Sequence, residues 1–229
     1  MGTADHWLAS IWPLVRAQLP EAPASVVDVG CGPRGGFVPM LRSQGYDAIG
    51  VDPEAPDGPL YRRTEFEHAE LPRHVDAFVA SASLHHVAEP AAVIDRFTGA
   101  VVVIEWAWES FDARTAEWCF SRLGPDGDHG WLHRRRDEWR SSGQDWSSYL
   151  RGWAERENVH TGESLIRLLD ERLERRHLVR GPYYFADLFE TTAADEQEAI
   201  EAGEIQANRI DWIGRSRSGA TPILSPSAG

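Results

Sequence analysis

Lysine is absent from this chain of 229 residues, so all 23 of its basic residues are arginine. The absence excludes Schiff-base catalysis, a P-loop lysine and the Tyr/Lys pair of one class of dehydrogenases. Cysteine is scarce as well: Cys31 and Cys119 are too few for a disulfide framework and lack the spacing of metal ligands. We therefore expect a reducing, cytoplasmic environment and no bound metal.

Long apolar runs are also missing, and no secretory signal pattern opens the sequence, so we expect no membrane association. Acidic residues outnumber basic ones by 36 to 23, which gives a formal net charge of -13. This balance disfavours nucleic acid as a partner, because phosphate binding relies on clustered cations. Composition leaves the oligomeric state open.

The apolar pattern alternates between strand and helix periods, which predicts an α/β fold with a parallel sheet and helices on both faces. An amphipathic helix over residues 4–19 comes first. Strands are predicted at 26–30, 46–51, near 61–66, 77–80, 100–105, from 178 and at 209–213, and helices near 36–44 and at 90–97, 161–172 and 193–202. The length favours one domain over residues 1–215, followed by a tail at 216–229 whose Ser, Gly and Pro content predicts disorder.

A glycine turn follows the first of these strands. Gly30, Gly32 and Gly35 satisfy G-x-G-x-x-G, and Asp52, about 20 residues further on, is placed to accept hydrogen bonds from ribose hydroxyls. The glycines alone also fit a nicotinamide or flavin enzyme. Asp28 lies inside the strand, where dinucleotide-binding folds have an apolar residue, and a buried carboxylate needs a partner such as a ligand amino group, an amide or water.

Three segments together resemble the successive motifs of class I S-adenosylmethionine-dependent methyltransferases: Asp28-Val-Gly30-Cys31-Gly32, Gly50-Val-Asp52-Pro53, and residues 76–87, which include Ser81-Ala82 and Leu84-His85-His86-Val87. The resemblance covers roughly residues 24–106 and implies a Rossmann-like sheet of seven mostly parallel strands, the last one antiparallel. It also implies S-adenosylmethionine as cofactor and S-adenosylhomocysteine as product. The chain departs from the family at Arg34, where a third glycine is usual.

The same resemblance assigns the cofactor-binding residues. The glycine loop would back the methionine part, the acid after the second strand would bind the ribose, Glu67 and His68 would hold the adenine, and the loop at Ser81 and Ala82 would close over the sulfonium. The full set is Asp28, Gly30, Cys31, Gly32, Asp52, Pro53, Glu67, His68, Ser81 and Ala82.

His85 and His86 follow the fourth strand, at the sheet edge where ligands of open α/β folds bind. Either histidine would serve as a general base for a weakly acidic acceptor at neutral pH. The alternative is a structural pair that satisfies loop carbonyls. Metal binding by the pair with Glu89 lacks a convincing arrangement of ligands.

Residues 109–160 interrupt the strand and helix alternation and are expected to form a helical insertion, mainly helical over 134–153 and with a turn at 124–127. Half of the ten tryptophans lie in this region, which fits either an aromatic cap over the substrate or a packed core of its own. The substrate candidates are Trp12, Trp106, Glu109, Tyr183 and Tyr184.

The sequence therefore predicts a methyltransferase that acts on a small-molecule acceptor. The alternatives are a nicotinamide-dependent oxidoreductase and a Rossmann-like scaffold without catalysis.

Overall fold

The computed structural model describes residues 3–124 and 130–217. Its centre is one sheet of seven strands in the order β3-β2-β1-β4-β5-β7-β6. The strands are β1 (Ser25–Val29), β2 (Asp47–Val51), β3 (Tyr61–Arg62), β4 (Ala77–Ser81), β5 (Ala100–Trp106), β6 (Leu173–Gly181) and β7 (Arg209–Ser216). Only β7 runs antiparallel to its neighbours β5 and β6, while every other pair is parallel. The predicted fold is confirmed, including the antiparallel last strand.

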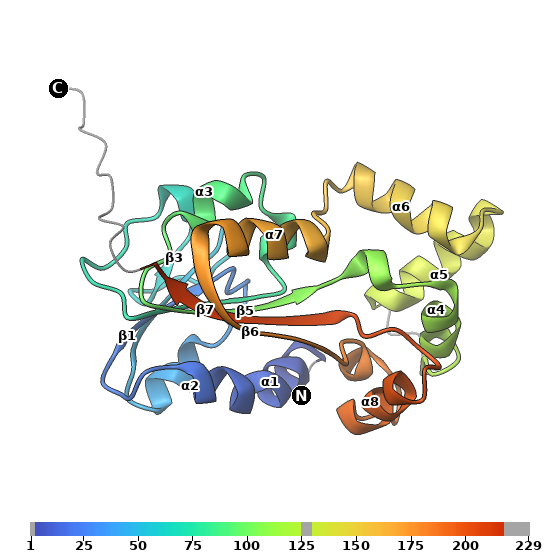
Figure 1. Ribbon diagram of the computed structural model, residues 1–229, viewed down its shortest axis with the longest axis horizontal. Coiled ribbons are helices and arrows are strands. Elements are labelled where there is room, and N and C mark those ends of the chain that lie inside the picture. Colours follow the sequence, from blue (N-terminus) through green and yellow to red (C-terminus); the bar gives the residue numbers. More distant parts are fainter. Residues whose placement is uncertain (1–2, 125–129, 218–229) are drawn as a thin grey trace.

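Helices cover both faces of the sheet (Figure 1). The α-helices are α1 (Thr3–Gln18), α2 (Val38–Ser43), α3 (Pro90–Ile94), α4 (Ala113–Phe120), α5 (Trp131–Ser142), α6 (Trp146–Arg156), α7 (Gly162–Arg172) and α8 (Ala193–Glu201). The 3-10 helices are η1 (Phe66–His68), η2 (Leu84–His86), η3 (Trp108–Ser110) and η4 (Phe185–Asp187). Apolar residues of α1 and α2 form a core with one face of the sheet, and those of α3 and α7 form a core with the other. Because both faces are covered, β1 and β4 are mainly apolar, and Asp28 is the exception within β1.

A third apolar cluster joins α4, α5 and α6 to the end of β5. These helices lie beyond one end of the sheet, at the right in Figure 1. The predicted helical insertion is therefore present, but Gly143 divides the expected helix over 134–153 into α5 and α6. Its φ of 69° ends α5 in the left-handed conformation that glycine tolerates, and Asp145 caps the start of α6. The turn expected at 124–127 lies largely outside the described residues.

The strand predicted from residue 178 is longer than expected, because β6 begins at Leu173, directly after α7. Residues 174–180 are all exposed and mostly charged, so the segment lacks the apolar pattern by which a strand is recognised. The strand expected near 61–66 has only two residues, and the last strand extends to Ser216. Residues 218–229 of the expected tail lie outside the described residues.

Among residues 3–124 and 130–217, no helix combines the length and hydropathy that a membrane crossing requires.

Candidate active site

The candidate site lies at the edge of the sheet where the parallel strands end. Gly30 and Gly32 follow β1, Asp52 follows β2, the loop from Ala82 to His86 follows β4, and Trp106 ends β5. Parallel pairing brings these carboxyl ends to one edge, where the connecting loops leave a crevice. Two cavities open there.

The first, which we call the glycine-loop cavity, has a volume of about 350 Å³. It unites six residues that the sequence assigned to the cofactor, together with His86. Its lining is Val29, Gly30, Gly32, Val51, Asp52, Pro53, Glu65, Phe66, Glu67, Ala82, Ser83, His86 and Val87.

The two glycines of the turn have different reasons for lacking a side chain. Gly30 has φ +77°, and a Cβ there would collide with the Ser83 side chain, whose Oγ donates to the Val29 carbonyl at 2.8 Å. It is therefore needed so that the glycine loop can contact the loop after β4, rather than for the approach of a ligand alone. Gly32, with φ +65°, faces open space, so a Cβ there would project into room that the turn now leaves free.

Asp52 is held beside this turn by backbone amides. Its Oδ2 accepts from the Gly32 N–H at 3.0 Å, and its Oδ1 accepts from the Glu54 N–H at 2.7 Å. A carboxylate oxygen can accept two hydrogen bonds, so each one keeps a free acceptor position. Asp52 can therefore bind a pair of ligand hydroxyls from a fixed position.

Asp28 and Cys31 do not line the cavity but support it. Asp28 is only 2% exposed, and its Oδ2 accepts from the Phe37 N–H at 2.6 Å. Burial raises the pKa of this carboxyl to about 7, against the lowering effect of the Phe37 amide. Of the partners foreseen for Asp28, the structure supplies an amide. The Cys31 thiol packs against Gly50, and burial raises its pKa.

Glu67 and His68 differ in what they offer to a ligand. Glu67 lines the cavity, and its buried Oε2 has no hydrogen-bond partner. The His68 side chain is exposed, and its N–H donates to the Glu65 carbonyl at 3.1 Å within η1. The backbone N–H of His68 is therefore already hydrogen-bonded and is not free to bind adenine. The Glu67 carboxylate, in contrast, has an unused acceptor oxygen.

The second cavity, which we call the aromatic cavity, has a volume of about 450 Å³. It is lined by Ala82, His85, His86, Trp106, Trp131, Arg135, Trp153, Glu157, Tyr183, Tyr184 and Asp187. Trp106 donates from Nε1 to the Tyr184 hydroxyl at 2.8 Å, and its ring is stacked with that of Tyr183, the centroids 5.9 Å apart. The predicted substrate residues Trp106, Tyr183 and Tyr184 thus form one wall.

Ala82 and His86 line both cavities, so the two meet at the loop after β4. Ala82 adopts φ 49°, a left-handed conformation uncommon for a residue with a Cβ. The Ile104 carbonyl holds its amide at 2.7 Å. Strained backbone of this kind is a recurrent feature of functional sites.

His85 forms a buried pair with Glu105. Its Nδ1 lies 2.6 Å from Glu105 Oε2, while Glu105 Oε1 accepts from the amides of Ser83 and Leu84 at 2.9 and 2.6 Å. Burial opposes ionisation of Glu105, but His85 and the two amides outweigh it and hold the pKa below its usual range. An ionised carboxylate can only accept, so Nδ1 carries a proton, and in the neutral ring Nε2 then has the free lone pair.

His86 is in a different environment, with its ring centroid 4.1 Å from that of His85. Partial loss of solvent is the main cause that lowers the pKa of His86 to about 4; the electrostatic effect of His85 adds to it, and Glu105 opposes it. His86 is therefore neutral at pH 7.

Three further predicted residues lie outside both cavities. Trp12 packs against Phe37 on the α1 side of the sheet, with ring centroids 6.0 Å apart, and the structure does not bring it to the aromatic cavity. Glu109 was expected to contact the substrate. Its two carboxylate oxygens instead accept from the amides of Gly162 and Glu163 and cap the start of α7. Ser81 Oγ accepts from Trp7 Nε1 at 3.4 Å, beneath the start of α1.

Sequence reasoning missed part of the aromatic cavity. Trp131 and Arg135 are one turn apart on α5, and Trp153 lies on α6. The helical spacing of the first two indicated that they share a face of the helix. It did not show that this face lines a cavity. Glu196 was also missed: it is fully buried, and its carboxylate accepts from the amides of Tyr183, Tyr184 and Phe185. Glu196 thereby holds the backbone of Tyr183 and Tyr184 in place at the wall of the aromatic cavity.

Comparison with known proteins agrees with this geometry. A family model described as a methyltransferase domain matches residues 5–172. No curated protein matches the chain. Among solved structures, an S-adenosylmethionine dependent methyltransferase from Mesorhizobium loti shares 19% identity at a TM-score of 0.51, covering 90% of this chain and 98% of its own.

Geranyl diphosphate C-methyltransferase from Streptomyces coelicolor A3(2), solved with Mg²⁺, geranyl diphosphate and S-adenosyl-L-homocysteine, shares 15% identity at a TM-score of 0.53. The match covers 93% of this chain and 80% of that one. At such identities the structures support the fold, and the family model, which spans well over half of the chain, decides the family. The chain belongs to the methyltransferase domain family and is a class I S-adenosylmethionine-dependent methyltransferase.

Proposed function

We propose that this methyltransferase acts on a small molecule held in the aromatic cavity, with the cofactor in the glycine-loop cavity. The observation that carries the proposal is the meeting of the two cavities at Ala82 and His86. S-adenosylmethionine supplies a methyl group activated by a positively charged sulfur. Because such a transfer is an in-line displacement, the protein's main tasks are to align the two reactants and exclude water.

The residues of the glycine-loop cavity fit this cofactor. Asp52 offers two acceptor positions to the ribose hydroxyls, and the unpartnered Glu67 Oε2 suits an N–H donor such as the adenine amino group. The open space at Gly32 leaves room for the methionine portion. Asp28, Cys31, His68 and Ser81 act in this proposal as supports of the loops rather than as ligands.

Helices α5 and α6, together with the wall formed by Trp106, Tyr183 and Tyr184, enclose the acceptor. Trp106, Trp131, Trp153 and Tyr183 offer flat apolar surfaces that suit a planar or apolar molecule. Within the aromatic cavity, His85 is the residue that removes a proton from the acceptor, through Nε2, while Glu105 positions it. His86, with its low pKa, is a weaker base and acts by shaping the junction of the cavities.

Calorimetric titration with S-adenosylhomocysteine, run beside NADH and NADPH, tests the cofactor site without knowledge of the acceptor. We expect micromolar binding of S-adenosylhomocysteine alone. Asp52→Ala should weaken it by roughly 2 to 4 kcal/mol, because two hydrogen bonds to a charged acceptor are lost. Asp57→Ala is the matched control, since Asp57 is exposed and paired only at the surface with Arg63.

Binding of NADH or NADPH instead would favour the oxidoreductase alternative. Absence of binding by all three compounds would favour a scaffold without catalysis. Unchanged affinity in folded Asp52→Ala protein would remove Asp52 from the ribose site.

A further inference from the structure

Arg135 is an unusual residue in the wall of the aromatic cavity. It is 8% exposed although it carries a permanent charge, and its Nη2 pairs with Glu138 Oε1 at 2.8 Å. Its Nε and Nη1 are buried without a hydrogen-bond partner. Unpartnered donors on a buried cation are costly, and Arg135 lines the aromatic cavity, so an acceptor bound there would relieve this cost.

The surroundings of Arg135 compensate its charge only in part. The guanidinium lies 5.8 Å from the ring centroid of Trp131 and 5.2 Å from that of Trp153. Such contacts contribute little compared with a carboxylate partner. Glu138 is half exposed, and its other oxygen accepts from the Tyr149 hydroxyl at 2.9 Å, so its charge is shared with a second donor.

The remaining charged or titratable groups of the cavity do not neutralise Arg135. Glu157 and Asp187 are exposed at the rim, and within the described part of the chain neither forms an ion pair with Arg135. The low pKa of His86 keeps that ring neutral at pH 7. Glu105 is already committed to His85 and to the amides of Ser83, Leu84 and Trp106. The buried part of the cavity therefore combines flat aromatic walls with one incompletely paired cation.

We propose that the methyl acceptor is a planar, apolar carboxylic acid whose carboxylate pairs with Arg135 while its rings or chain lie against Trp106, Trp131 and Trp153. This assignment rests on the proposed function, because it names the substrate class for the same cavity. A guanidinium prefers planar carboxylates, and the aromatic walls supply the apolar contact.

The test uses matched probes on the full protein loaded with S-adenosylhomocysteine. The acids 4-hydroxybenzoate and indole-3-acetate are compared with their neutral amides, with phenyl phosphate and with the cation tryptamine, by calorimetry and by quenching of tryptophan fluorescence. We expect the acids to bind about 10- to 100-fold more tightly than the amides, the range of one hydrogen-bonded charge pair.

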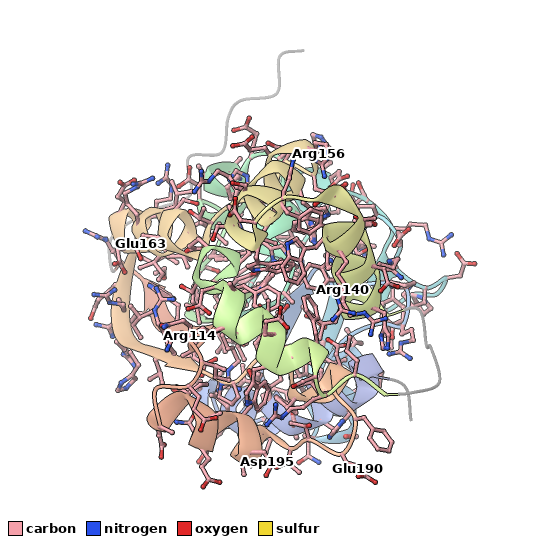
Figure 2. All side chains as sticks on the ribbon, turned by 90° about the vertical axis from the view of Figure 1, so that its right-hand side faces the viewer. Arg114, Arg140, Arg156, Glu163, Glu190 and Asp195 are labelled. Carbon is pink, nitrogen blue, oxygen red and sulfur yellow. The ribbon has the colours of Figure 1, made fainter. Side chains whose placement is uncertain are left out.

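Variants then test whether Arg135 causes the preference for acids over amides. Arg135→Gln should abolish the difference between acid and amide, and Arg135→Lys should restore part of it. Arg140→Gln removes the same charge from an exposed position of the same helix and should change nothing; Figure 2 labels Arg140 on the end of the molecule formed by α4, α5 and α6.

Several outcomes would overturn the proposal. They are equal binding of acids and amides, absence of binding by every acid, a preference for phenyl phosphate or tryptamine, and an acid preference that survives Arg135→Gln. The comparison of probes on the unmodified protein stands even if a variant fails to fold. Loss of S-adenosylhomocysteine binding in the unmodified protein would instead refute the proposed function, so the two failures are distinguishable.

Discussion

Replacement of Glu105 by glutamine should reverse the tautomer of His85. Glu105 Oε1 accepts from two backbone amides, and only an oxygen can satisfy them, so the new amide oxygen must stay there. The new NH₂ group then faces His85 Nδ1 and donates to it. Nδ1 must accept, the proton moves to Nε2, and the ring loses the lone pair proposed to act on the substrate.

The energetic cost follows from the bonds that change. The two amide bonds to Oε1 become neutral rather than charge-assisted, the Trp106 N–H loses its acceptor Oε2, and the 2.6 Å contact with His85 is inverted. A hydrogen bond to a charged group contributes about 1.5 to 3 kcal/mol and a neutral one about 1, so stability should fall by about 2 to 4 kcal/mol. With an acceptor that needs deprotonation, the turnover rate should fall by about 10² to 10⁴.

Nitrogen-15 NMR of the imidazole measures the tautomer directly and needs no substrate, and urea unfolding gives the stability. Glu109→Gln is the control, because Glu109 also follows β5 and also accepts from two amides, but it caps α7. It should lower stability without altering the His85 signals. A proton on Nε2 in the unmodified protein, or on Nδ1 in Glu105→Gln, would refute the reasoning.

Two further predictions concern buried carboxylates that line neither cavity. Asp28 has a folded pKa of about 7 against 3.8 when unperturbed, so the folded state retains a proton that the unfolded state releases, and stability should fall between about pH 4 and 7 by up to about 4 kcal/mol. In urea unfolding, Asp28→Asn should become more stable relative to the unmodified protein as the pH rises, and a difference independent of pH would contradict this. Glu196→Ala should destabilise the protein by about 3 to 6 kcal/mol, because three amides lose their acceptor. The exposed Glu198→Ala on the same helix should cost little in thermal unfolding, and equal effects of the two variants would count against the account of Glu196.

Much of the fold was predictable because the evidence is local. Strands buried on both faces, such as β1 and β4, are mainly apolar, and the glycines and acids that follow the strands mark the ends that converge at one edge. For that reason the sequence could bring Asp52, Glu67 and Ala82 to the same edge, where they line one cavity; their roles stay predictions. The cofactor side depends on short segments whose spacing the sheet determines.

The acceptor side was less predictable, because its residues come together only through tertiary packing. Trp12 and Trp7 lie on the same helix, yet only Trp7 reaches Tyr183, with ring centroids 5.0 Å apart. Glu105 and Glu109 follow the same strand, and their contacts with η2 and α7 depend on helices distant in sequence. The sequence around a tryptophan does not show whether its side chain lines a cavity or packs in a core.

The exposed strand β6 has a consequence for the behaviour of this protein in concentrated solution. It forms the open edge of the sheet, and an unpaired edge can recruit a strand from another molecule. Four of its nine residues are Glu174, Arg175, Arg176 and Arg180, which bring charge and bulk into any such pairing. Charged side chains on an edge strand oppose aggregation, and in this chain without lysine the basic ones are arginines. Exchange of these arginines for threonine or valine should therefore favour fibrillar self-association.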